Sequence, residues 1–179
     1  LKKIKKTAEA GHIILVAGGK TGRDGIHGVT FASAELTEKS EEVSRPAVQI
    51  ADPIEEEKVK RALMRIRDLG LGSATTDLGG GGMSSAIGET AERFDCGATV
   101  NLDKIPLKYA GLAPWEIYIS ESQERMLLTV PPENLEKALA VFEKEDVEVT
   151  AVGTLTRERR LQIRYQGVTV ADMGMQFLF

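Results

Sequence analysis

Glycine is the residue that most constrains how this chain can fold. The sequence has 18 glycines in 179 residues, and half of them fall in two short segments, 18–28 and 79–82. Because glycine lacks a Cβ atom, it permits left-handed backbone and lets other groups approach the main chain closely. Two dense clusters therefore predict segments whose backbone lies against a ligand or against another chain.

The rest of the composition is that of a globular protein, with 42% hydrophobic and 28% charged residues. The net charge of −4 argues against a protein that binds the nucleic-acid backbone. The single cysteine, Cys96, excludes an internal disulfide framework and a cysteine-built zinc site, and it fits a cytoplasmic location. No apolar run approaches the roughly 18–20 residues of a membrane helix. We therefore expect neither nucleic acid nor a membrane as a partner.

Strand and helix signals alternate along the chain and predict an α/β (α+β) fold, a mixed sheet flanked by helices. Asp52, Pro53 and Gly70 suit the cap, the first turn and the end of one amphipathic helix. The predicted strands are 12–17, 28–34, 73–78, 98–102, 125–130, 147–155, 161–165 and 168–171, and the other predicted helices are 83–94, 114–119 and a segment after Pro132.

We expect one domain over residues 1–179, with 1–10 as a linker or a helical lead-in. The chain begins with Leu1 rather than Met, so we also expect it to be a piece of a longer protein.

The first glycine segment contains Gly-Lys-Thr but does not have the spacing of a P-loop. Ile14 stands where the first glycine of that motif would be. What remains is a loop with backbone amides and two cations, in which Lys20, Gly22 and Arg23 are candidates to hold phosphate or carboxylate. The alternative is a tight turn between strands whose charges face water, and the spacing favours neither.

The second glycine segment follows a carboxylate. Asp77 stands at the end of a predicted strand, Gly79–Gly82 follow, and a helix begins with two hydroxyl residues. Ligands of α/β sheets gather at strand ends, and Mg²⁺ keeps most of its water and needs few protein ligands. Asp77 is thus a candidate Mg²⁺ ligand, with a helix cap or a turn as the alternative.

A third polar segment, Ile119–Arg125, leads into an apolar strand. It holds two acids, an amide, two hydroxyls and an arginine. Such side chains at the start of a strand can bind a polar ligand, and a charged turn before an edge strand is the alternative. The sequence contains no Gly-X-Ser-X-Gly motif, and no nucleophile–base pair can be proposed from it.

Four stretches, in this order, resemble one known family. They are GGKTGRDGIHGVTFAS at 18–33, VQIADP at 48–53, DLGGGGMSS at 77–85 and ISESQERMLL at 119–128. Together they are similar to the large (synthetase) subunit of phosphoribosylformylglycinamidine synthase, over nearly the whole chain. That family is built from two tandem repeats that each resemble aminoimidazole ribonucleotide synthetase. This chain resembles the C-terminal domain of the first repeat.

The resemblance implies an ATP-dependent C–N ligase of purine biosynthesis. ATP phosphorylates the formamide oxygen of formylglycinamide ribonucleotide, and ammonia derived from glutamine then displaces phosphate to give the amidine. Mg²⁺ neutralises phosphate charge in such transfers. The implied cofactors are Mg²⁺ and ATP as co-substrate. The implied partners are this ribonucleotide, the remaining synthetase domains, a glutaminase component and a small accessory subunit.

The family motifs also imply roles for individual residues. Gln49 of VQIADP resembles a substrate-binding amide, and Asp77 resembles a Mg²⁺ ligand. Glu121, Ser122 and Gln123 resemble substrate contacts. For Asp77 and the 121–123 trio, this agrees with the interpretation from the residues alone.

Two departures from the family bear on function. Thr76 and Leu78 flank Asp77 where relatives usually have Gln and Met. The catalytic histidine and the ATP-holding residues of the family belong to parts that this chain lacks, so no catalytic residue is assigned and the isolated domain is expected to be inactive. The alternatives are a non-catalytic phosphate- or nucleotide-binding module, or another superfamily member of the selenophosphate synthetase or hydrogenase maturation type.

Overall fold

The computed structural model describes residues 7–26 and 51–179. Within them a seven-stranded sheet has the order β2-β4-β1-β5-β3-β6-β7, and it is mixed because β3 and β6 are parallel while the other neighbours are antiparallel. The strands are β1 (Ile13–Gly18), β2 (Ala74–Asp77), β3 (Gly97–Asn101), β4 (Arg125–Val130), β5 (Val149–Thr156), β6 (Arg160–Tyr165) and β7 (Val168–Gly174).

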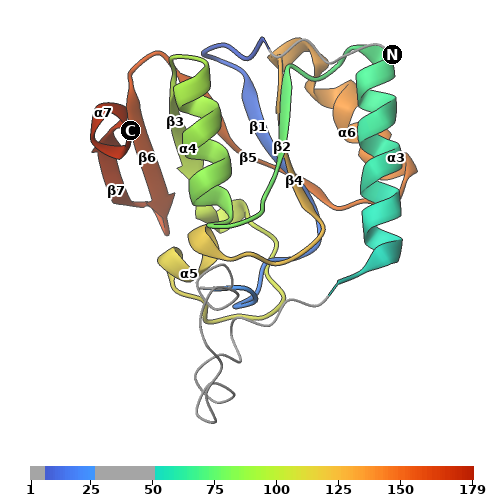
Figure 1. Ribbon diagram of the computed structural model, residues 1–179, viewed down its shortest axis with the longest axis horizontal. Coiled ribbons are helices and arrows are strands. Elements are labelled where there is room, and N and C mark those ends of the chain that lie inside the picture. Colours follow the sequence, from blue (N-terminus) through green and yellow to red (C-terminus); the bar gives the residue numbers. More distant parts are fainter. Residues whose placement is uncertain (1–6, 27–50) are drawn as a thin grey trace.

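Helices cover both faces of this sheet, as Figure 1 shows. The helices are α3 (Pro53–Leu69), α4 (Met83–Arg93), α5 (Pro114–Ile119), α6 (Leu135–Lys144) and α7 (Met175–Leu178), with 3-10 turns η2 (Leu102–Lys104) and η3 (Pro132–Asn134). The predicted fold class is confirmed, and the helix predicted after Pro132 is split into η3 and α6. The strand predicted over 28–34 lies outside the described residues.

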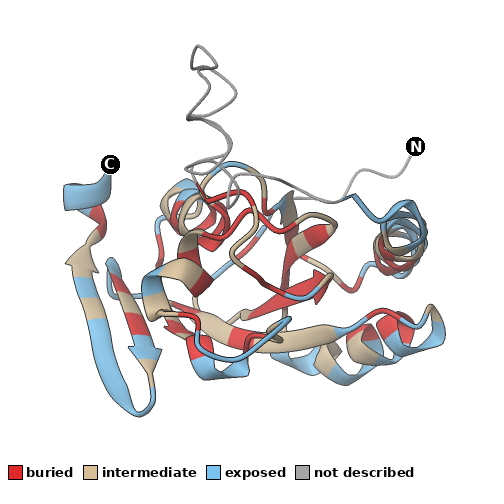
Figure 2. Cartoon of the chain, turned by 90° about the horizontal axis from the view of Figure 1, so that it is seen from below, coloured by how far each residue is buried: buried red, intermediate tan, exposed pale blue. Residues whose placement is uncertain are grey.

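Alternating side chains of β1 build a core on each face of the sheet. Ile14 and Val16 belong to the cluster under α4, whereas Leu15 and Ala17 belong to the cluster under α3 and α6. This is the alternation that the two-residue period of a strand imposes. Burial is concentrated between the sheet and its helices, and the β6–β7 hairpin projects beyond them with exposed residues (Figure 2).

Helix α3 begins and ends where its sequence predicts. The Asp52 carboxylate accepts hydrogen bonds from the backbone amides of Ile54 and Glu55, both at 3.1 Å. Gly70 ends the helix with a left-handed backbone at φ +67°, as glycine does at many helix C-termini. These caps fix α3 against β1 and β4, where it forms one wall of the site described below.

Two glycines permit a close approach that no other residue would allow. Gly18 has φ +106°, and a Cβ atom there would lie 2.0 Å from the carbonyl oxygen of Glu124. Gly82 has φ +57°, and its Cβ would lie 2.0 Å from the carbonyl oxygen of Ser120. Both glycine clusters therefore pack against the turn at residues 120–124, which belongs to the same chain.

No helix in the described part of the chain is long and apolar enough to cross a membrane.

We predict that Gly18→Ala lowers the free energy of unfolding by about 3 kcal/mol or more, because it adds a backbone clash to left-handed strain. Gly167→Ala is the matched control, since Gly167 has φ +76° but nothing lies within 4 Å of its Cβ position. The control should cost only about 1–2 kcal/mol. Chemical denaturation measures both, and equal losses would contradict the close approach.

Candidate functional site

The three polar segments predicted from the sequence meet in space. The Gly81 amide donates a 3.0 Å hydrogen bond to Oε1 of Glu121, which links the second glycine segment to the 120–124 turn. The Gly22 amide donates a 2.9 Å hydrogen bond to Oγ of Ser122, which links the first segment to the same turn. The turn is therefore the point where segments about a hundred and about forty residues apart are joined.

Arg125 fixes this turn through hydrogen bonds from its buried guanidinium. Its guanidinium donates to Oγ1 of Thr21 at 2.8 Å and to the carbonyl oxygens of Ser122 and Ser120 at 2.8 and 2.5 Å. The residue is only 3% exposed. Burial lowers the pKa of Arg125 to about 10, and the charge of Asp24 acts against that shift. The side chain therefore stays a cation, and its N–H groups donate hydrogen bonds to the turn and to the first loop.

Asp24 is a second connection between the first loop and the turn. Its carboxylate accepts hydrogen bonds from Oγ of Ser122, at 2.5 Å, and from Nζ of Lys108. Its carbonyl oxygen accepts a 3.0 Å hydrogen bond from the Glu121 amide. Burial opposes ionisation of Asp24, but the hydrogen bonds from Lys108 and Ser122 hold its pKa below the usual value.

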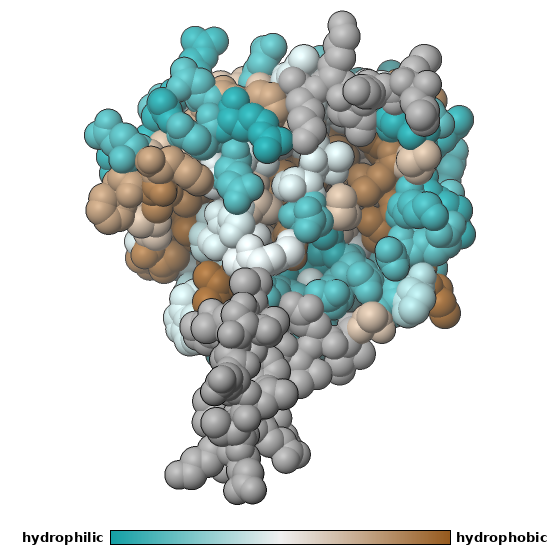
Figure 3. Space-filling view, in the orientation of Figure 1, coloured by the Kyte–Doolittle hydropathy of each residue, from teal (hydrophilic) through white to brown (hydrophobic). Residues whose placement is uncertain are grey.

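A groove of about 530 Å³ opens beside this junction, between α3 and the edge of the sheet. We call it the β2–α3 groove. Asp77 at the end of β2 and Gln123 of the turn both line it, so two of the predicted site residues share one concavity. Apolar residues form much of its wall, and apolar surface lies beside α3 in Figure 3. These wall residues are Val59, Leu63, Met64, Leu78 and Met126.

The strand register explains why Asp77 lies there. β2 pairs with β4 so that Asp77 is opposite Met126, which places the carboxylate next to the start of β4. Asp77 is exposed, as a residue that contacts a ligand should be. Groups of three or more His, Cys, Asp or Glu side chains that could hold a metal are absent from the described residues. A single carboxylate suits Mg²⁺ that keeps most of its water.

The three residues of the 121–123 trio differ in how far they are exposed. Glu121 and Ser122 are 5% and 1% exposed, and both hold the junction together. Gln123 is partly exposed, lines the groove, and donates from Nε2 to the Glu121 carbonyl oxygen at 3.3 Å. Gln49 lies outside the described residues. Contact with substrate stays a prediction for all four.

The candidate phosphate loop has most of its polar groups engaged within the chain. The amides of Thr21 and Gly22 donate to Pro106 and Ser122. The Arg23 guanidinium pairs with Glu116, with Nε–Oε1 at 2.6 Å. The phosphate role of Lys20, Gly22 and Arg23 stays a prediction, and only Lys20 of these extends to another groove.

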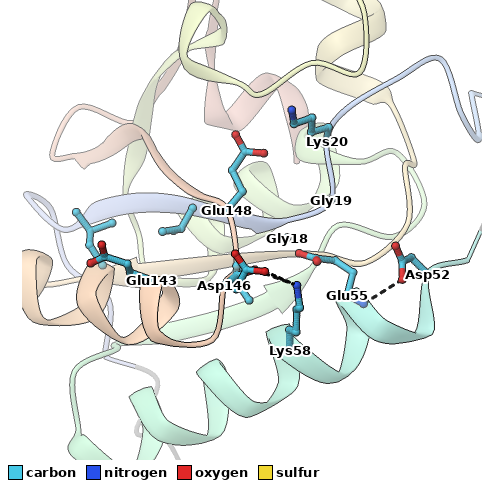
Figure 4. A pocket seen from close by; sticks show the side chains of 12 residues that line it. Gly18, Gly19, Lys20, Asp52, Glu55, Lys58, Glu143, Asp146 and Glu148 are labelled. Carbon is cyan, nitrogen blue, oxygen red and sulfur yellow. Dashed lines mark hydrogen bonds and ion pairs between the residues drawn. The ribbon is translucent and has the colours of Figure 1, made fainter.

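That second groove, of about 780 Å³, is rich in carboxylates (Figure 4). We call it the acidic groove. Lys58 pairs with Asp146 across it at 2.7 Å. Burial raises the pKa of Glu55, helped by neighbouring carboxylates. Because carboxylates repel phosphate, these surroundings do not favour a phosphate beside Lys20. The acids that line the groove are Asp52, Glu55, Glu143, Asp146 and Glu148.

Sequence reasoning missed Asp24 and Lys108. Asp24 stands inside the glycine-rich segment, where a charged residue next to Arg23 gives no sign of its partner. Lys108 is 84 residues away and lies in a loop without a motif. A parallel bridge between Thr21 and Leu107 and a hydrogen bond from the Arg23 amide to the Tyr109 hydroxyl bring that loop to the junction.

The mixed sheet with helices on both faces is the fold of the C-terminal domain of aminoimidazole ribonucleotide (AIR) synthase related proteins. The family model of the C-terminal domain of AIR synthase related proteins matches residues 9–166. The chain belongs to this family.

The chain is similar to curated relatives named phosphoribosylformylglycinamidine synthase subunit PurL. It is 46% identical to that of Thermoplasma volcanium over 97% of this chain and 23% of the relative. It is 43% identical to that of Methanothermobacter thermautotrophicus over 94% of this chain and 24% of the relative. The chain therefore spans about a quarter of the length of these relatives.

Solved structures give the same similarity. PurL of Thermotoga maritima in complex with FGAR is 34% identical, with a TM-score of 0.88 over 97% of this chain and 29% of that one. The same protein in complex with ATP is 30% identical, with a TM-score of 0.83, over 99% of this chain and 27% of that one. HypE of Escherichia coli is 18% identical, with a TM-score of 0.64 over 92% of this chain and 50% of that one, and shows the fold alone.

We predict that Asp24 makes stability depend on pH in acid. Its folded-state pKa lies below the unfolded value of about 4. Its contribution to stability is thus present above about pH 4 and is lost as pH falls through the folded-state pKa. Asp24→Asn should lose stability less steeply than the wild type below about pH 4 in urea denaturation series. Equal slopes would contradict the pairing with Lys108 and Ser122.

Proposed function

We propose that this chain is the substrate- and Mg²⁺-binding domain of a phosphoribosylformylglycinamidine synthase. The observation that carries the proposal is that Asp77 and Gln123 line one groove. The FGAR complex of the similar Thermotoga maritima protein supports the choice of ligand. FGAR is formylglycinamide ribonucleotide, whose phosphate, hydroxyl and amide groups need polar partners.

The proposed reaction converts this ribonucleotide, ATP and glutamine-derived ammonia to formylglycinamidine ribonucleotide. Gln123 can both donate and accept hydrogen bonds, which suits an amide or sugar group of the substrate. Gln49 belongs to the proposed binding set by its motif. The buried Glu121 and Ser122 support the turn that carries Gln123.

Asp77 is the residue of this chain that would hold Mg²⁺. When bound, Mg²⁺ neutralises phosphate charge during phosphoryl transfer. Asp77 is exposed at the end of β2, and such a carboxylate would suit Mg²⁺, which needs few protein ligands.

The parent enzyme is proposed to be cytoplasmic and to include further synthetase domains, a glutaminase component and a small accessory subunit. Its catalytic histidine and most ATP contacts would belong to those further domains, so the chain alone is proposed to bind without turnover. The hydrogenase maturation alternative has less support, because HypE is 18% identical whereas Thermotoga PurL is 34% identical.

Calorimetric titration tests this proposal. The chain in MgCl₂ should bind formylglycinamide ribonucleotide, and Gln123→Ala should weaken binding about tenfold because the ligand loses a hydrogen-bond partner. Asp77→Asn should reduce the dependence of binding on Mg²⁺. Gln162→Ala is the control, since Gln162 donates to Asp172 on the distant β6–β7 hairpin.

Mixing tests the enzyme as a whole. Combining the chain with the remaining synthetase parts, glutaminase, ATP and Mg²⁺ should restore turnover. If no mixture shows turnover and the wild-type chain does not bind the ribonucleotide, the proposed function is wrong.

A further inference from the structure

The side chain of Ser122 is engaged with partners within the chain. A hydroxyl donates one hydrogen bond and accepts up to two. Ser122 Oγ donates to Asp24 at 2.5 Å and accepts from the Gly22 amide at 2.9 Å, and Ser120 Oγ lies 3.1 Å away. With 1% of the residue exposed, its side chain serves the junction.

Asp24 accepts the hydrogen bond from the Ser122 hydroxyl, and it contacts the 120–124 turn at two points. Its carboxylate accepts from Ser122 and its carbonyl oxygen accepts from the Glu121 amide at 3.0 Å. Lys108 holds the same carboxylate from a third segment of the chain. Asp24 is thus fixed on one side and holds two successive residues of the turn on the other.

The residue that follows these two is Gln123, which lines the β2–α3 groove. A shift of the 120–122 backbone would move Gln123 directly. Arg125 holds the same backbone by donating hydrogen bonds to the carbonyl oxygens of Ser120 and Ser122. The turn is therefore held by two groups, the carboxylate of Asp24 and the guanidinium of Arg125.

We infer that Asp24 is a positioning residue: through Ser122 and the Glu121 amide it fixes the 120–124 turn and so directs Gln123 into the β2–α3 groove. The inference rests on the proposed function for the ligand that Gln123 would bind, but the contacts that fix the turn do not depend on that ligand. It also assigns Ser122 a supporting role in place of direct substrate contact by its side chain.

Two readouts test the inference. The first is hydrogen exchange of the Gly22 and Glu121 amides, which donate to Ser122 and Asp24. In Asp24→Asn and in Ser122→Ala, exchange at one or both should accelerate about tenfold or more, while the Leu128 amide of β4 stays unchanged. Asp172→Asn, which breaks an ion pair with Arg160 on the β6–β7 hairpin, should leave both junction amides unchanged.

The second readout is affinity for formylglycinamide ribonucleotide in a double-mutant cycle. Asp24→Asn should weaken binding about tenfold in the wild type and much less in Gln123→Ala, because Asp24 acts through Gln123. A general loss of structure would give equal effects in both backgrounds. If Asp24→Asn does not fold, Ser122→Ala takes its place in the cycle.

The outcomes separate the two proposals. If the wild-type chain does not bind the ribonucleotide, the proposed function fails, and amide exchange alone decides on the positioning role. Unchanged exchange at Gly22 and Glu121 in both variants would overturn that role, and so would additive losses of affinity in the cycle.

Discussion

The approach of two glycines to the carbonyl oxygens of the 120–124 turn is the constraint on which the site depends. Gly18 ends β1, and Gly82 precedes α4 at its N-cap. Any side chain at either position would push the turn away from the sheet, because its Cβ would lie 2.0 Å from a backbone oxygen. The glycine clusters thus allow strand ends, a helix start and a polar turn to occupy one small volume.

Charged side chains then hold the first loop against the 120–124 turn. Arg125 is buried without a carboxylate in hydrogen-bonding distance among the described residues, and it instead satisfies its donors with two carbonyl oxygens and one hydroxyl. Asp24 supplies the opposite charge nearby. Because a buried ion is costly unless it is compensated and hydrogen-bonded, this arrangement fixes the first loop and the turn relative to each other. The β2–α3 groove gains a rigid border on the side of Gln123.

Much of the fold could be predicted from local sequence. The strand β4 spans the predicted residues, and α3 has its predicted caps, because apolar runs and cap residues act within a few positions of each other. The resemblance gave binding roles to Asp77 and to the 121–123 trio, and Asp77 and Gln123 line one groove. Direct ligand contact by Ser122 stays a prediction, and its hydroxyl is hydrogen-bonded to Asp24 and to the Gly22 amide. Nothing local identifies Asp24 and Lys108 as its neighbours, since long-range pairing in an α+β sheet brings them together.

Backbone amide chemical shifts, mapped during titration with formylglycinamide ribonucleotide and MgCl₂, locate the binding site on the chain. The largest changes should occur around Asp77 and Gln123, which both line the β2–α3 groove. Changes confined to the acidic groove around Lys20 and Glu148, with none at Asp77 or Gln123, would contradict it.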